Sequence, residues 1–138
     1  MPESMTAGRP LPSPPPGIPA LTYRDNPAAA RQFARNRAAA AGLTEPRLTD
    51  LVIAVGELAA NTLRHTDGPG TVRLWAEPDE VICEVRDGGH IRDDLAGRRC
   101  PAADAGRGHG LWIVHQVCDL VELRTGIAGT VFRLHLGL

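Results

Sequence analysis

The stretch LVIAVGELAANTLRHT, residues 51–66, decides how the rest of this chain is expected to fold. Its apolar side chains recur every three or four residues, which is the spacing of one buried stripe on an amphipathic helix. Glu57, Asn61 and His65 follow one another at intervals of four and form a second, polar stripe. The apolar stripe consists of Leu48, Leu51, Val52, Val55, Leu58, Ala59 and Leu63. The segment therefore predicts a helix with one buried side and one polar side.

The polar stripe places a carboxylate, Glu57, one helical turn before a carboxamide, Asn61. An amide oxygen is a hard ligand that suits Mg²⁺, and a nearby carboxylate can accept a proton. The pair therefore fits a site that handles a metal-bound phosphate. The alternative is an ordinary solvated face of a packed helix, and the helix alone does not decide between the two.

Composition restricts the class of protein. The chain has 138 residues, of which 43% are hydrophobic and 22% charged, and its formal net charge is -1. That length suits one domain with a real core, and the near-neutral charge gives no reason to expect nucleic-acid binding. No apolar run is long enough to span a bilayer, and the first residues do not resemble a secretory signal. We therefore expect no membrane segment and a cytoplasmic location.

The basic residues and cysteines exclude several chemistries. All 15 basic residues are arginines. The absence of lysine excludes a P-loop, the eukaryotic-type kinase fold and Schiff-base catalysis, because each depends on a lysine amine. Three widely spaced cysteines match neither a disulfide framework nor a zinc site.

The remaining pattern predicts one domain, residues 20–138, after a disordered, proline-rich leader at residues 1–19. Its order of helices and strands favours an α+β fold, a two-layer sandwich in which helices cover one face of a sheet. The expected elements are a strand at 20–23, a helix at 27–41 capped by Asn26, a second helix opened by residues 44–46, strands at 71–77 and 80–86, a polar loop at 90–105, a helix at 111–119, and strands at 120–125 and 130–136.

Two strand ends carry candidate base-binding groups. Asp87 ends a predicted strand and is followed by Gly88 and Gly89. A carboxylate there can accept a hydrogen bond from an exocyclic amine, and the glycine lets the backbone approach a flat base. Thr130 opens the last strand, where its hydroxyl can reach a ring nitrogen. The alternatives are a common Asp-Gly turn and a threonine that simply favours strands.

The segment GRGHGL, residues 106–111, is a candidate phosphate cradle. Its alternate glycines expose successive backbone N–H groups, and a helix is predicted to begin directly after them. Arg107 is placed either to contact a terminal phosphate or to point to solvent. A glycine hinge without a ligand is the alternative for the whole segment.

The order and spacing of these parts are more specific than any one of them. ELAAN, a strand ending in DGG, GRGHGL before a helix and GT before the last strand resemble the N, G1, G2 and final-threonine elements of the GHKL ATPase superfamily. The stretch VGELAANTLRHT looks most like the bacterial anti-sigma factor serine kinases. This resemblance implies the Bergerat ATP-binding fold, with a mixed, largely antiparallel sheet backed by helices. Many relatives have a second glycine where this chain has His90.

The resemblance also implies residue roles. Asn61 would hold Mg²⁺, Glu57 would activate the acceptor hydroxyl, and Asp87 would bind the adenine amine above Gly89. Thr130 would complete the adenine contacts. The implied phosphate-binding segment comprises Gly106, Arg107, Gly108, His109, Gly110 and Leu111, with Gly108 and Gly110 lining the phosphates.

The function implied by the resemblance is transfer of the γ-phosphate of Mg-ATP to a serine of a small anti-anti-sigma type protein. A sigma factor is the second implied partner, and a homodimer is compatible with the family. One alternative is a non-catalytic ATP-binding switch that sequesters a sigma factor or another partner. Another is an interaction domain whose nucleotide site has decayed.

Overall fold

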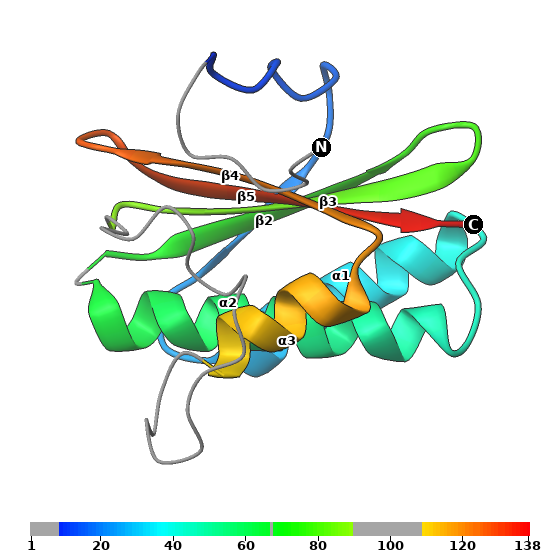
Figure 1. Cartoon of the computed structure of the whole chain (residues 1–138), viewed down its shortest axis with the longest axis horizontal. Coiled ribbons are helices and arrows are strands. Elements are labelled where there is room, and N and C mark those ends of the chain that lie inside the picture. The colour runs from blue at the N-terminus through cyan, green and yellow to red at the C-terminus, as the bar shows by residue number, and fades with distance from the viewer. Residues whose placement is uncertain (1–8, 67, 90–108) are drawn as a thin grey trace.

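The protein is described by a computed structural model at residues 9–66, 68–89 and 109–138. Three helices and five strands make up this part of the chain, and Figure 1 shows how they are arranged. They are β1 (Ala20–Tyr23), α1 (Pro27–Ala40), α2 (Arg47–His65), β2 (Gly70–Ala76), β3 (Glu80–Asp87), α3 (His109–Val117), β4 (Leu120–Gly126) and β5 (Gly129–Gly137). Each predicted helix and strand is therefore present, with ends shifted by at most a few residues.

The five strands form one sheet in the order β1-β2-β3-β5-β4. Figure 1 shows α1, α2 and α3 together on one side of this sheet. The predicted two-layer α+β sandwich is therefore confirmed. All four strand pairings are antiparallel, so the sheet is not mixed in the part of the chain that the structure describes. The physical reason is the strand order: β3 and β4 run in the same direction, but β5 lies between them.

The core lies between the sheet and the helices. In α2, Leu51, Val55 and Leu58 are at most 2% exposed, as their helical spacing predicts. Burial of each such side chain contributes about 1.5–3 kcal/mol, so this stripe fixes the helix against the sheet. The strands supply the facing side chains Val72, Leu74, Val81, Cys83, Val85, Leu123, Leu134 and Leu136. Among the described helices, none has the length and apolar character needed to cross a bilayer.

Side-chain hydrogen bonds lie at the start of both long helices, and the first of them is a helix cap. Asn26 Oδ1 accepts a hydrogen bond from Ala28 N at 2.9 Å, which confirms the predicted cap of α1. The helix α2 begins at Arg47, slightly later than predicted. The reason is that the Glu45 carboxylate stays outside the helix and accepts bonds from Thr49 N at 3.2 Å and Thr49 Oγ1 at 2.6 Å. Those bonds satisfy a backbone donor of the first turn.

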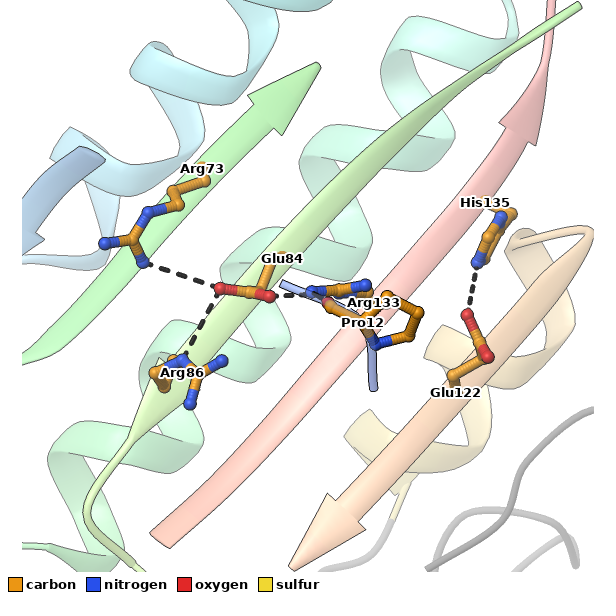
Figure 2. Close-up of polar contacts among 7 residues, drawn as sticks. All are labelled: Pro12, Arg73, Glu84, Arg86, Glu122, Arg133 and His135. Atoms are coloured by element: carbon orange, nitrogen blue, oxygen red, sulfur yellow. Dashed lines mark hydrogen bonds and ion pairs between the residues drawn. The ribbon is translucent and has the colours of Figure 1, made fainter. Parts of the chain in front are cut away.

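The face of the sheet opposite the helices holds a fully buried carboxylate, Glu84 of β3. Figure 2 shows three arginines directed at it. Arg133 Nε lies 3.0 Å from Glu84 Oε1, while Arg86 Nε and Arg73 Nη1 lie 3.4 and 3.5 Å from Glu84 Oε2. The guanidinium of Arg133 also lies 5.2 Å from the centre of the Trp75 ring. A buried carboxylate is costly without such partners, so the arginines are what allow Glu84 to lie here.

Residues 9–19, the described part of the predicted leader, lie on this same face (Figure 1). Arg133 Nη2 donates a hydrogen bond to the carbonyl oxygen of Pro12, and Arg124 Nε donates to that of Arg9 at 2.8 Å. The segment thus contacts the arginines of the sheet through its backbone. The division into a leader at 1–19 and a domain at 20–138 stays a prediction.

Candidate functional site

The candidate residues come from segments that are far apart in sequence and meet at one end of the sheet. Thr62 of α2 donates a hydrogen bond from Oγ1 to Asp87 Oδ2 at the end of β3, at 2.8 Å. Thr130 at the start of β5 donates from Oγ1 to the carbonyl oxygen of Gly89, also at 2.8 Å. At the start of α3, a Cβ placed on Gly110 would lie 3.2 Å from the Glu57 carboxylate. The helix α2 therefore adjoins both the β3 turn and α3.

Glu57 and Asn61 lie on the partly exposed side of α2, as predicted from their spacing. The carboxylate of Glu57 lies against Gly110, and any side chain at that position would crowd it. Glycine therefore lets the first turn of α3 approach the acid closely. The carboxamide oxygen of Asn61 accepts a hydrogen bond from Arg64 Nη2 at 2.9 Å. The positive guanidinium would therefore compete with a metal for that oxygen.

Asp87 is held from two directions. Its Oδ2 accepts the bond from Thr62, and its Oδ1 accepts one from the backbone N–H of Gly89 at 2.7 Å. Gly89 is also confined, because a Cβ there would lie 2.6 Å from Thr66 Cγ2. These contacts fix the carboxylate relative to α2, and the glycine lets the turn lie close to Thr66. Each carboxylate oxygen can accept a further hydrogen bond, so this group can recognise the amine of a flat heterocycle.

Two residues that sequence patterns did not single out complete this network. The Tyr23 hydroxyl lies 2.9 Å from Thr62 Oγ1, and both residues are buried. Burial raises the pKa of Tyr23 to about 12, so the phenol is neutral at physiological pH. A usable signal did exist for Thr62. It lies one turn after Leu58 on the buried stripe, where a polar side chain requires a partner.

Thr130 ties the β4–β5 hairpin to the turn after β3. Besides its bond to Gly89, its hydroxyl lies 2.7 Å from Thr125 Oγ1, and the residue is 4% exposed. Gly129 has a φ of 123°, and a Cβ there would clash with the carbonyl oxygen of Asp87. Glycine is therefore required for the hairpin to lie this close to β3. The predicted contact between Thr130 and a base stays a prediction.

The predicted phosphate segment is described only in part. Gly106, Arg107 and Gly108 lie outside the described residues, as does the predicted loop at 90–105. The backbone of His109 begins α3, and Gly110 and Leu111 lie in its first turn. Gly110, in the first turn of this helix, lies against Glu57. The N-terminal end of a helix carries a partial positive charge, which favours a negatively charged ligand.

The donor set fits Mg²⁺ that is bound together with a phosphate. Among the described residues, no group of three or more His, Cys, Asp or Glu side chains could hold a metal ion. A metal held by protein side chains alone therefore has no site in the described part of the chain. Mg²⁺ commonly takes one or two protein oxygens and completes its coordination with phosphate and water. Asn61 supplies such an oxygen, with Glu57 one turn away.

Together, these features define a nucleotide-binding domain of the ATPase type: an antiparallel sheet backed by helices, an acid and an amide on one helix, and a strand-end aspartate beside glycine. The sequence matches the family described as histidine kinase-like ATPase domain over residues 21–136. The chain therefore belongs to this ATP-binding family. A search of curated proteins found no match.

Proposed function

We propose that this domain is a cytoplasmic protein serine/threonine kinase of the anti-sigma factor type. It transfers the γ-phosphoryl group of Mg-ATP to a serine of a small anti-anti-sigma type protein. The observation that carries the proposal is the contact between Glu57 and the start of α3, on the same helix that holds Asp87 through Thr62. The helix α2 thereby holds the proposed base-binding group, Asp87, and also carries Glu57 beside the proposed phosphate-binding end of α3.

The two ends of the nucleotide are assigned from this arrangement. Asp87 accepts a hydrogen bond from the adenine amine, and Gly89 lies beneath the base. Along α2, Thr62 and Glu57 are five residues apart, a rise of about 7.5 Å. The triphosphate therefore extends from Asp87 toward Glu57 and Gly110, where the backbone N–H groups of the first turn of α3 receive it.

In the transfer step, Glu57 accepts the proton of the serine hydroxyl. A bond forms between the serine Oγ and the γ-phosphorus, and the bond from that phosphorus to the β–γ bridging oxygen breaks. ADP leaves with the electron pair. Asn61 would hold Mg²⁺, which would neutralise charge on the phosphates when bound. Such transfer depends mainly on positioning and electrostatics, so few side chains are needed.

The test compares Glu57→Gln with Glu77→Gln, an exposed residue in the turn between β2 and β3. Both variants are incubated with labelled Mg-ATP and candidate anti-anti-sigma proteins. Loss of general-base catalysis lowers the rate by about 10²–10⁴-fold, so we expect Glu57→Gln to lose phosphoserine formation while still binding ATP. Glu77→Gln retains the rate. A Glu57→Gln protein that phosphorylates its partner normally contradicts the proposed role of this acid.

The second candidate function is a non-catalytic switch that binds ATP and sequesters a sigma factor or another partner. The bond from Arg64 to the Asn61 oxygen favours it, because that bond occupies the atom proposed to hold the metal. A switch retains partner binding in Glu57→Gln and forms no phosphoserine with the unmodified chain. Size-exclusion chromatography of the mixed proteins, with and without ATP, separates this outcome from the kinase.

A further inference from the structure

A chain of three side chains runs from the edge of the sheet to the candidate base-binding group. The Tyr23 hydroxyl of β1 lies 2.9 Å from Thr62 Oγ1 of α2, which lies 2.8 Å from Asp87 Oδ2 of β3. Tyr23 is 2% exposed and Thr62 is 0% exposed. Solvent therefore does not supply alternative partners, and the three groups must satisfy one another.

The chemistry of the three groups determines which of them donates each hydrogen bond. The Thr62 hydroxyl has one proton, and the carboxylate of Asp87 can only accept. Bonds to a charged acceptor are stronger than bonds to a neutral carbonyl, so Asp87 is preferred over the Leu58 carbonyl oxygen at 3.2 Å. The neutral phenol of Tyr23 then donates to Thr62. The relay thus runs from Tyr23 through Thr62 to Asp87.

The packing of the neighbouring strand fixes the position of the Tyr23 ring. Tyr23 is paired with Gly70 across β1 and β2. A Cβ on Gly70 would clash with the tyrosine ring, including a 2.9 Å approach to Cε1. Glycine at the start of β2 therefore makes room for the ring to reach α2.

These hydrogen bonds restrict the orientation of the Asp87 carboxylate. Its Oδ2 is fixed by Thr62 and its Oδ1 by the N–H of Gly89, so rotation of the carboxylate breaks two bonds at once. Each oxygen keeps capacity to accept one further hydrogen bond. The carboxylate is thereby prepared to meet a donor in one plane, and a ligand that presents an acceptor there is rejected.

We propose that Tyr23 and Thr62 are positioning residues that orient Asp87 to accept a hydrogen bond from the exocyclic amine of adenine. They thereby make the site select adenine over hypoxanthine nucleotides. This inference rests on the proposed function, which places adenine at Asp87. Neither residue contacts the base itself; both act through the carboxylate.

The experiment measures Mg-ATP and Mg-inosine triphosphate binding by calorimetry for the full chain and its variants. Inosine triphosphate has a carbonyl oxygen where ATP has the amine. A hydrogen bond to a charged group corresponds to about a 10–100-fold preference for ATP in the unmodified chain. Thr62→Val and Tyr23→Phe are expected to lower that preference by about fivefold or more, mainly through weaker ATP binding. Thr62→Ser keeps the hydroxyl and is expected to keep the preference of the unmodified chain.

The controls separate orientation from general damage. Thr22→Val changes an exposed residue next to Tyr23 and is expected to leave both affinities unchanged. Gly70→Ala disturbs the ring of Tyr23 from another strand and is expected to lower the ATP preference in the same way. Tyr23→Phe removes only the hydroxyl and keeps the ring, so it still tests the inference if Thr62→Val does not fold.

The possible results are distinct. An unmodified chain that prefers ATP, with variants that keep the same preference, overturns the relay and leaves the proposed function standing. Equal losses of affinity for both nucleotides overturn the relay as well, because they indicate only structural damage. An unmodified chain that binds neither nucleotide, or both equally, overturns the placement of adenine at Asp87 and the relay with it.

Discussion

Replacement of Glu84 by glutamine tests the charge cluster on the face opposite the site (Figure 2). The carboxylate is fully buried, and Arg133, whose side chain is 7% exposed, lies 3.0 Å from it. Glutamine keeps the shape of the side chain but removes the charge that neutralises this arginine. Loss of one partner of a buried ion pair costs about 3–5 kcal/mol. Arg73 and Arg86 are 30% and 51% exposed, so solvent screens them and they add little to this cost.

We therefore expect Glu84→Gln to lower the free energy of unfolding by about 3 kcal/mol, because the amide oxygen still accepts one hydrogen bond. For a chain of this size that loss lowers Tm by about 10 °C. The assay is urea unfolding followed by circular dichroism. Glu122→Gln is the control, since its side chain is 31% exposed and pairs with His135, and it should cost under about 1 kcal/mol. Equal effects of the two substitutions would refute the reasoning.

Three further predictions concern single groups. Arg64→Ala frees the Asn61 oxygen, so Mg²⁺-dependent ATP affinity should rise about two- to fivefold in calorimetry with and without Mg²⁺; a decrease contradicts the proposed metal ligand. Tyr23 is the chain's only tyrosine, and its pKa is raised from 10.0 to about 12, so the stability it contributes is present below pH 10 and lost as the pH rises through 12. Ultraviolet absorbance should show tyrosinate forming near the ordinary pKa only in denatured protein. Burial raises the pKa of Cys83 and of Cys118, so alkylation at neutral pH, read by mass spectrometry, should modify these thiols only after unfolding.

Most of the fold follows from local sequence patterns. The strand at 20–23 and the cap at Asn26 were predicted as they are found, because a cap and an alternating strand depend on neighbouring residues. The predicted stripe on α2 identified five buried side chains for the same reason, namely Leu48, Leu51, Val55, Leu58 and Ala59, whereas Val52 and Leu63 are only partly buried. The strand order was not predicted in detail, because hairpin and helix signals do not specify that β5 lies between β3 and β4.

The site was predictable only where spacing carries information. The spacing of Glu57 and Asn61 placed both on one side of α2, as found. The bond between Thr62 and Asp87 joins residues 25 apart in sequence, and that between Tyr23 and Thr62 joins residues 39 apart. No periodicity reports such contacts. The burial of Glu84 was not predicted either, because it depends on arginines from neighbouring strands that surround it.

The most direct test of the nucleotide site is calorimetric titration of Mg-ATP into the unmodified chain, Asp87→Asn and Asp79→Asn. Asp79 is an exposed aspartate in the turn between β2 and β3 and serves as the matched control. We predict saturable binding by the unmodified chain and by Asp79→Asn, with a loss of about 10-fold or more in Asp87→Asn. Absence of binding at millimolar ATP, or equal affinity in all three proteins, would contradict the account.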